Sequence, residues 1–461
     1  MEEGTVKHFL NNRGEYSNPE FIQELKEKNE ALNFMRNITE GEENSGELEN
    51  IPFLVKDAIC TSGTITSAGS KMLKDYRPPF NATVVERLEE SGGKFYGKTN
   101  MDEFGFGTFS TNCAFGTPKN PHDNERVVGG SSGGAGAAVA ALDYPLISIG
   151  ESTGGSITNP ASYNGVVGLT PTYGRVSRYG LVDYANSLDK IGVLAKTVFG
   201  AAKGLEIIAG EDENDQTTSS KKVNNYSELK QKENLKIGVP KQMIEVDGIE
   251  EGVRENFKHS LEELEQIGEV ERVDIPLLSA DITLPAYYII AMAEASTNLA
   301  KFSGMRYGYE KDTEEFEDFN EYFSEVRSEA FGEEVKRRIL LGTYIRKAGY
   351  RDQYYIKAAK VRTKIINSFE EAFEEYDVLV TPSMPNIAPK IEEAENLSPA
   401  EMYAMDSMTV GPNLAGVPQV SVPNGTSNGM PTGLQFLGPQ FAEEKLLNIA
   451  YSFERLKSDQ F

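Results

Sequence analysis

The sequence predicts an α/β fold, because short, mainly apolar runs of strand length alternate with longer segments of helical periodicity. Residues 51–55, 235–240 and 378–380 are runs of the first kind. Residues 253–264 and 361–373 carry large apolar side chains at the spacing of one helix face. Such alternation is typical of a sheet with helices packed against it.

The first predicted strand ends at a lysine. Residues 51–55 are apolar throughout, and Lys56 follows directly. A short run of this kind predicts a strand buried on both faces. A lysine at its inner end is expected to be shielded from water, which favours the neutral amine. The preceding residues 38–50 are polar and acidic and predict a loop.

Three further segments follow in order. Residues 135–142 are small and apolar and predict a buried helix, and the G-x-x-x-x-G-K-[ST] spacing of a phosphate loop is absent before them. Residues 211–234 are polar and predict a linker. The helix predicted over 253–264 places His259 off its apolar face, in an acidic and solvated setting.

Composition narrows the classes of function. The 461 residues suffice for two or three domains on length alone. The formal net charge of −25 argues against direct binding of nucleic acid, because phosphate backbones require basic patches. The two cysteines, Cys60 and Cys113, form neither a disulfide framework nor a zinc pattern, and we expect no metal site.

The beginning of the sequence and its hydropathy predict a cytoplasmic protein. The first ten residues, MEEGTVKHFL, are acidic and lack the apolar core of a signal peptide. Apolar stretches of 18 residues without charge are absent, so we expect no membrane span.

Two glycine-rich loops carry the candidate chemistry. They are GGSSGG at 129–134 and STGGS at 152–156. Serine catalysis normally takes its base from histidine, yet the chain holds only His8, His122 and His259. A serine nucleophile with a lysine base is therefore the favoured interpretation. The competing interpretation is that these loops are flexible connections or close-packing devices, which is their usual role.

Within these loops we assign Ser156 as nucleophile and Ser131 as the residue that bridges it to Lys56. A hydroxyl both donates and accepts a hydrogen bond, so a second serine can relay a proton from the first to the lysine. The turn before Ser156 has no bulky side chain, and its successive backbone N–H groups can form an oxyanion hole. The residues of this predicted oxyanion hole are Thr153, Gly154 and Gly155.

Several long blocks, taken together, resemble the amidase signature family. The similarity runs from about residue 50 to about 455. The blocks that carry it are VVGGSSGGAGAAVAA with GESTGGSITNPASYNGVVGLTPTYGRVSRYGLVDYANSLDKIGVLAKTV, ATVVERLEESGGKFYGKTNMDEFGFGTFSTN at 82–112, EVKRRILLGTYIRKAGYRDQYYIKAAKVRTKI at 334–365, NLAGVPQVSVPNG at 413–425 and PTGLQFLG at 431–438.

The resemblance implies a mixed central β-sheet covered by helices on both faces, with a helical insertion. It divides the chain into an N-terminal helical or loop segment, 1–50, and an amidase signature domain, 51–461. That domain contains the polar linker at about 211–234 and the insertion at about 245–375.

The family's Lys–Ser–Ser triad maps onto Lys56 as base, Ser131 as bridging serine in a cis peptide, and Ser156 as the nucleophile that forms the acyl-enzyme. Ser132 competes with Ser131 for the bridging role. The chain departs from the family pattern in the spacing of the two serine loops, which is one residue longer, in a short segment before Lys56, and at three residues. Ser152 stands where aspartate is expected, Thr158 where arginine is expected and Val128 where proline is expected.

Within the family, the blocks resemble members that hydrolyse glutamine for a tRNA-dependent amidotransferase. By that resemblance Arg338 takes the α-carboxylate of free glutamine, Asp406 takes the α-ammonium, and Tyr287 and the Gly107 loop line the pocket. An arginine fork matches a carboxylate, and an aspartate attracts an ammonium. The alternative for Arg338 and Asp406 is an ordinary surface ion pair.

The resemblance also implies partners. Ammonia released from glutamine would pass to partner subunits B and C, where ATP and Mg²⁺ are used to amidate mischarged Glu-tRNA(Gln) or Asp-tRNA(Asn). The tRNA would be contacted mainly through a partner, and this chain would hold no cofactor of its own. Two alternatives remain: a stand-alone amidase for small amides, and a catalytically idle scaffold in a synthetase assembly.

Overall fold

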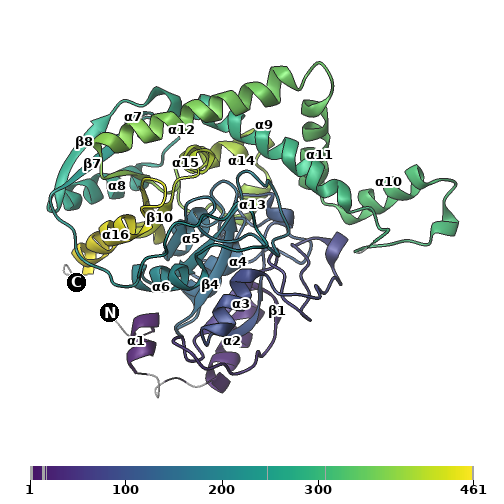
Figure 1. Cartoon of the computed structure of the whole chain (residues 1–461), viewed down its shortest axis with the longest axis horizontal. Coiled ribbons are helices and arrows are strands. Elements are labelled where there is room, and N and C mark those ends of the chain that lie inside the picture. The colour runs from purple at the N-terminus through teal and green to yellow at the C-terminus, as the bar shows by residue number, and fades with distance from the viewer. Residues whose placement is uncertain (1–3, 13–15, 17, 247, 307, 459–461) are drawn as a thin grey trace.

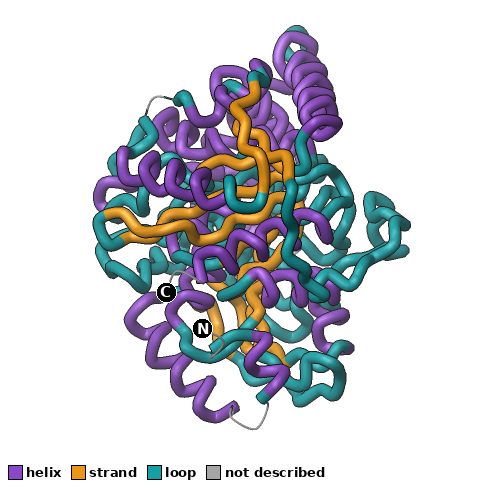
Figure 2. The backbone as a smooth tube through the Cα atoms, turned by 90° about the vertical axis from the view of Figure 1, so that its left-hand side faces the viewer, coloured by secondary structure: helices purple, strands orange, loops and turns teal. Residues whose placement is uncertain are grey.

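The computed structural model describes residues 4–12, 16, 18–246, 248–306 and 308–458. Its centre is an 11-stranded sheet with the order β1-β3-β2-β4-β6-β5-β10-β11-β9-β7-β8, which runs through the molecule in Figures 1 and 2. The strands are β1 Met35–Ile38, β2 Pro52–Lys56, β3 Lys94–Thr99, β4 Ile147–Ser152, β5 Val167–Thr170, β6 Lys190–Ala195, β7 Leu235–Pro240, β8 Gly268–Val273, β9 Val378–Pro382, β10 Gln419–Ser427 and β11 Met430–Leu437.

The sheet is mixed, as predicted. Strand β2 pairs in parallel with β3 and β4, and β7 pairs in parallel with β8 and β9. The central strands from β4 to β9 in the sheet order pair antiparallel, as does the edge strand β1 with β3. The register of β2 against β4 pairs Val55 with Ile149, which brings Lys56 next to the end of β4.

Helices cover both faces of the sheet. The helices are α1 Val6–Asn11, α2 Asn18–Leu32, α3 Thr83–Glu90, α4 Gly133–Ala141, α5 Thr158–Asn164, α6 Val198–Ile208, α7 Lys241–Ile244, α8 Glu251–Leu264, α9 Ala280–Asn298, α10 Phe319–Ala330, α11 Glu333–Arg346, α12 Lys357–Glu375, α13 Ile391–Glu395, α14 Pro399–Ala404, α15 Val410–Ala415 and α16 Glu443–Ser458.

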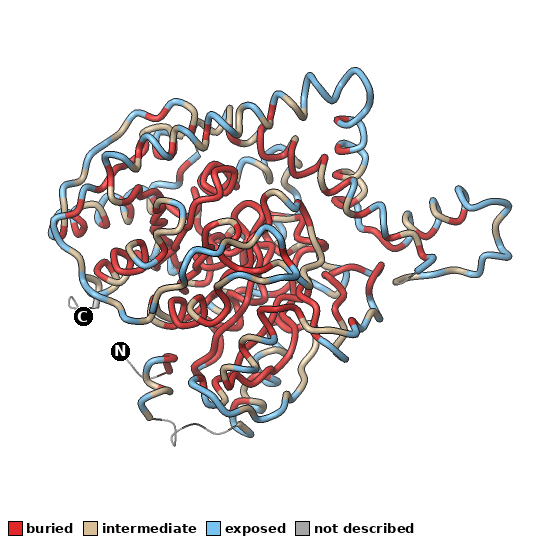
Figure 3. Tube along the Cα trace, viewed as in Figure 1, coloured by how far each residue is buried: buried red, intermediate tan, exposed pale blue. Residues whose placement is uncertain are grey.

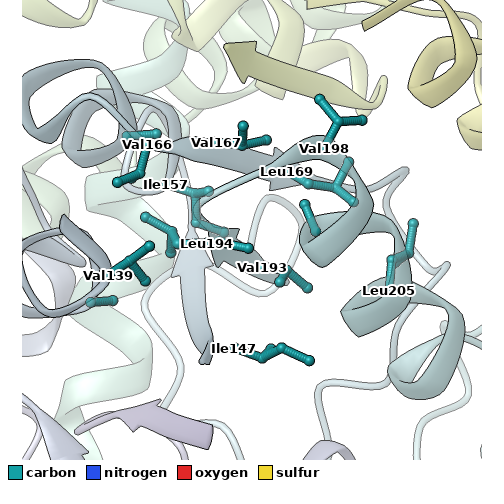
Figure 4. Close-up of a cluster of buried hydrophobic side chains, with 14 of the residues drawn as sticks. Val139, Ile147, Ile157, Val166, Val167, Leu169, Val193, Leu194, Val198 and Leu205 are labelled. Carbon is teal, nitrogen blue, oxygen red and sulfur yellow. The ribbon is translucent and has the colours of Figure 1, made fainter. Parts of the chain in front are cut away.

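Strand β6 shows how the two faces are covered. Gly192 faces Ile157, which precedes α5, whereas the next residue, Val193, faces Gly204 of α6. Successive strand residues point to opposite faces, so α5 and α6 lie on opposite sides of the sheet. The buried side chains that fill the space between these strands and helices are drawn in Figure 4.

The helices of the C-terminal half form a further layer. Helix α9 packs against α11, α12 and α15, whereas α10 projects from the body of the molecule, as Figure 1 shows. Figure 3 shows that this projection is mostly exposed, while the sheet and the helices beside it are buried. The predicted insertion at about 245–375 holds α8 to α12 and also the edge strand β8.

Most elements predicted from periodicity are confirmed. Strands β2, β7 and β9 lie at the predicted runs, and helices α4, α8 and α12 lie at the predicted apolar faces. Residues 211–234 form neither helix nor strand, but Asp212 and Asp215 anchor them by accepting hydrogen bonds from Thr83 and the backbone of Arg178. The linker is therefore a packed loop. In the described part of the chain, no helix is long and apolar enough to cross a membrane.

Strand β1 was missed by the sequence analysis. Its four residues, MRNI, are mostly half-buried and lack an alternating apolar pattern. It becomes a strand because it pairs antiparallel with β3, so that tertiary pairing rather than local composition determines its conformation.

Candidate active site

Lys56 lies at the end of β2 and is fully buried. Its Nζ atom lies 2.7 Å from Ser131 Oγ, 3.0 Å from the main-chain oxygen of Glu151 and 2.9 Å from Glu151 Oε2. The predicted contact between the lysine and the first serine loop is therefore present. The contact with Glu151 was not predicted.

The first serine loop presents Ser131, and not Ser132, to the amine. Ser132 Oγ instead donates to the main-chain oxygen of Glu151 at 2.9 Å and accepts from its N–H at 3.3 Å, which ties the loop to β4. The Gly130–Ser131 peptide bond is cis, as the resemblance implied. Of the two candidates for the bridging role, only Ser131 contacts the Lys56 amine.

Ser156 follows β4 and a tight turn, and α5 begins two residues later. The N–H of Ser132 donates to the Ser156 main-chain oxygen at 3.1 Å, so the two serine loops are joined through their backbones. Ser156 is 6% exposed, and its hydroxyl makes no hydrogen bond with the residues that the structure describes. The hydroxyl is therefore available to a substrate.

The turn before Ser156 has no room for larger residues. A Cβ atom added to Gly154 would lie 2.8 Å from the hydroxyl oxygen of Tyr287. One added to Gly155 would lie 2.5 Å from Thr409 Oγ1 and would also overlap Asn159. Both distances are shorter than a normal contact, so glycine is required at each position for packing.

Two buried carboxylates lie behind Lys56. The Thr153 hydroxyl is 2.9 Å from Glu151 Oε1 and 2.8 Å from Asp189 Oδ1. Asp189 also accepts backbone hydrogen bonds from Tyr184 and Ala185. Burial and the Glu151 charge raise the pKa of Asp189 well above its usual range. This cluster was not predicted from the sequence, although a glutamate near the end of the buried strand β4 was a signal of it.

Arg338 lies on α11 and is 3% exposed, so it is not a surface residue. Its Nε donates to Glu334 Oε1 at 2.7 Å, and its Nη1 donates to the Tyr184 hydroxyl at 2.5 Å. The guanidinium is surrounded by aromatic rings at 5.1 to 5.6 Å from their centroids, which suits a desolvated cation. The rings are those of Phe106, Tyr184, Tyr288 and Tyr403.

Asp406 lies in the 3-10 turn Met405–Met408 and is also buried. Its carboxylate accepts from the hydroxyls of Tyr288 at 2.6 Å and Thr108 at 3.2 Å, and from Asn159 Nδ2 at 3.2 Å. Burial raises the pKa of Asp406, while the Tyr288 hydrogen bond and the Arg338 charge oppose this in part. Asn159 lies three residues beyond Ser156, so Asp406 is connected to the segment that follows Ser156.

The other two predicted pocket residues, Tyr287 and Gly107, have different neighbours. The Tyr287 hydroxyl lies beside Gly154, while Gly107 packs on the Asp102 carboxylate so closely that an added Cβ would overlap it. Asp102 accepts from the backbone of Ser110 at 2.8 Å, and burial raises its pKa to about 6. Each predicted site residue therefore contacts another residue of the site or a residue next to one.

Several residues of the site carried no clear sequence signal. Tyr184 and Tyr288 are two of 21 tyrosines, and nothing local distinguishes them from the rest. Glu334 joins the site only through its contact with Arg338, one helical turn away. Asn159 joins it only through its contact with Asp406, which is distant in sequence. Within the described residues, no group of three or more His, Cys, Asp or Glu side chains could hold a metal ion.

Comparison with known proteins assigns the class. The model of the amidase family matches residues 18–447. The chain therefore belongs to the amidase family, and its buried lysine and its serine loops lie within the matched region.

Two curated relatives and one solved structure carry the same description, the A subunit of glutamyl-tRNA(Gln) amidotransferase. The chain is 48% identical over 436 residues to the relative from Thermoanaerobacter pseudethanolicus, covering 94% of this chain and 86% of the relative. It is 50% identical to the relative from Caldanaerobacter subterraneus, covering 89% and 83%. The crystal structure of the Thermotoga maritima protein superimposes with a TM-score of 0.82 at 39% identity, covering 98% and 94%.

Proposed function

We propose that this chain is the glutamine-hydrolysing component of a glutamyl-tRNA(Gln) amidotransferase. One observation carries the catalytic part of the proposal: Lys56 Nζ lies 2.7 Å from Ser131 Oγ in a fully buried setting, beside the glycine turn that holds Ser156. The similarity to amidotransferase A subunits over about nine-tenths of the chain carries the assignment to a particular reaction.

In the proposed reaction Ser156 attacks the side-chain amide carbon of glutamine. Its proton passes to Ser131, whose own proton passes to the neutral amine of Lys56. The backbone N–H groups of residues 153–155 stabilise the oxyanion. The C–N bond then breaks, ammonia leaves with a proton returned from Lys56, and water hydrolyses the γ-glutamyl ester of Ser156.

Recognition of glutamine is assigned to Arg338 and Asp406. Both are buried and both contact Tyr288, whose ring centroid is 5.5 Å from the guanidinium and whose hydroxyl bonds to the carboxylate. A buried cation and a buried anion that contact the same side chain fit the two charges of a free amino acid. Tyr287 and the Gly107 loop complete the pocket in this proposal.

The acceptor reaction is assigned to partner subunits B and C. They would use ATP and Mg²⁺ and hold the mischarged tRNA, since a net charge of −25 leaves this chain poorly suited to bind it directly. We place the assembly in the cytoplasm, as the sequence predicts. The division into an N-terminal segment, 1–50, and a catalytic domain, 51–461, also remains a proposal.

The deciding experiment uses the complex purified from its host. Ammonia release is measured from glutamine and from propionamide, a neutral amide without the two charges. We expect glutamine to be strongly preferred and Ser156→Ala to abolish its hydrolysis, whereas ammonium salt should still support tRNA amidation by the Ser156→Ala complex. Preference for propionamide would instead establish a stand-alone amidase.

A further inference from the structure

Glu151 supplies two of the three oxygen neighbours of the Lys56 amine. Its main-chain oxygen and Oε2 lie at 3.0 and 2.9 Å, and Ser131 Oγ is the third neighbour at 2.7 Å. A neutral amine keeps two N–H donors and one lone pair. When both donors are directed to the two Glu151 oxygens, the lone pair is left for Ser131. These contacts therefore orient the base as well as stabilising it.

The Glu151 side chain also brings charge. Glu151 and Lys56 form an ion pair in which both side chains are almost completely buried. A carboxylate next to an amine opposes the loss of a proton from the pair, and water screens this attraction little in a buried site. The structure thus places a carboxylate directly against the amine, in a setting where water screens little of the interaction between them.

The Glu151 side chain is also linked to a second buried carboxyl group, that of Asp189, through Thr153. The Thr153 hydroxyl is shared between Glu151 and Asp189, yet it has one proton to donate. Both contacts are satisfied when Asp189 carries a proton and donates it to Thr153, which in turn donates to Glu151. In that arrangement the hydrogen bonds run in one direction, from Asp189 through Thr153 to Glu151. The other titratable groups of this region are Asp102, on which the Lys56 charge acts, Arg178, which acts on Asp189, and Tyr184.

We propose that Glu151 is a positioning residue for the Lys56 base: its two oxygens direct the amine toward Ser131, and its carboxylate lies against the amine that takes the proton. The inference rests on the proposed role of Lys56 and deepens it. In balanced form, an N–H bond of the Lys56 ammonium breaks and its proton goes to water. The amine lone pair then takes the Ser131 proton while Ser131 Oγ takes the Ser156 proton.

The test uses three variants of the full-length chain. Glu151→Gln keeps an oxygen acceptor and removes the charge, Glu151→Asp keeps the charge, and Glu151→Ala removes both. The rate of sulfonylation of Ser156 by phenylmethanesulfonyl fluoride is measured against pH by intact-mass analysis, because this reaction needs the activated serine but neither glutamine nor a partner. Glutamine kcat/KM of the complex is measured over the same pH range.

We expect Glu151→Gln to move the acidic limb of both profiles to lower pH by about one to three units, the usual effect of removing an adjacent opposite charge. Glu151→Asp should keep the limb near its wild-type position, and Glu151→Ala should lower the plateau as well as moving the limb. Glu206→Gln is the matched control, since it breaks a lysine–carboxylate pair on α6 and should leave the limb unchanged.

An unchanged limb in folded Glu151→Gln would overturn the inference, even if the rate fell. A shifted limb in the sulfonylation profile without any hydrolysis of glutamine would support the inference and refute the proposed function. Absence of sulfonylation of the wild-type chain at every pH would overturn the base role of Lys56 and this inference with it.

Discussion

The Tyr288 hydroxyl donates a hydrogen bond of 2.6 Å to the Asp406 carboxylate. The ring of the same tyrosine lies beside the Arg338 guanidinium, with 5.5 Å between the ring centroid and the central carbon. Tyr288 therefore contacts both buried charges of the proposed glutamine site, while Arg338 is also paired with Glu334.

This arrangement predicts that Arg338→Ala and Asp406→Ala each lower kcat/KM for glutamine by about two orders of magnitude or more. Removing one partner of a desolvated charge pair costs roughly 2–5 kcal/mol, and each 1.4 kcal/mol is about a factor of ten. The measurement is ammonia release by the complex. Amidation supported by ammonium salt is the control and should be retained, because it bypasses glutamine.

Lys56→Arg should abolish glutamine hydrolysis although it keeps the positive charge. Arginine cannot be deprotonated in the working pH range, so it can pair with Glu151 but cannot accept the Ser131 proton. We expect kcat to fall by about three orders of magnitude or more, since a nucleophile and its base act as a unit. Ammonia release from glutamine by the variant complex gives the comparison.

His122→Ala is the matched control for a histidine base. The His122 ring contacts the main-chain oxygen of Asn164 at the end of α5, at 3.0 Å, and has a structural role in this position. Its removal should leave most of the activity. Near-normal turnover in Lys56→Arg combined with loss in His122→Ala would reverse the assignment of the base.

Gly154→Ala should reduce glutamine kcat/KM by roughly two orders of magnitude. The new methyl group would lie 2.8 Å from the Tyr287 hydroxyl, so either the tyrosine or the turn must move, and a displacement of about 1 Å near the reacting atoms costs about 10²-fold. Adding Tyr287→Phe removes the atom in closest contact. A double variant no better than Gly154→Ala alone would show that the turn needs glycine for another reason.

Glu103 gives a prediction for stability. It lies outside the proposed catalytic groups and accepts from Gly332 N at 2.9 Å and from Ser70 Oγ at 2.5 Å, and burial raises its pKa to about 7. Because this pKa is higher in the folded than in the unfolded chain, the folded state binds more protons between about pH 4.5 and 7. The contribution of Glu103 to the free energy of unfolding therefore decreases as pH rises through that range.

Glu103→Gln should remove this dependence. Relative to wild type, the Tm of the variant should be higher at pH 8 than at pH 5, with a difference in unfolding free energy on the order of 3 kcal/mol as an upper bound. Thermal unfolding of both proteins at the two pH values gives the comparison. A constant Tm difference would mean that Glu103 is ionised in the folded chain at pH 5.

The sequence by itself determined the chemical class of the site and most of the fold. The scarcity of histidine, the apolar run before Lys56 and the two serine loops were enough to select Lys56, Ser131 and Ser156 as candidates. Helical periodicity and apolar runs located α8, α12 and several strands, because burial of one face imposes a pattern that local sequence retains.

Only the tertiary structure decided which side chains support those candidates. Glu151 contacts Lys56 because β2 and β4 pair in parallel with Val55 opposite Ile149, and no local pattern specifies that register. Asp189, Tyr184 and Tyr288 join the site from loops and helices distant in sequence. Strand β1 forms only through its pairing with β3. Contacts between distant segments depend on how the elements pack together, which local propensity and periodicity do not encode.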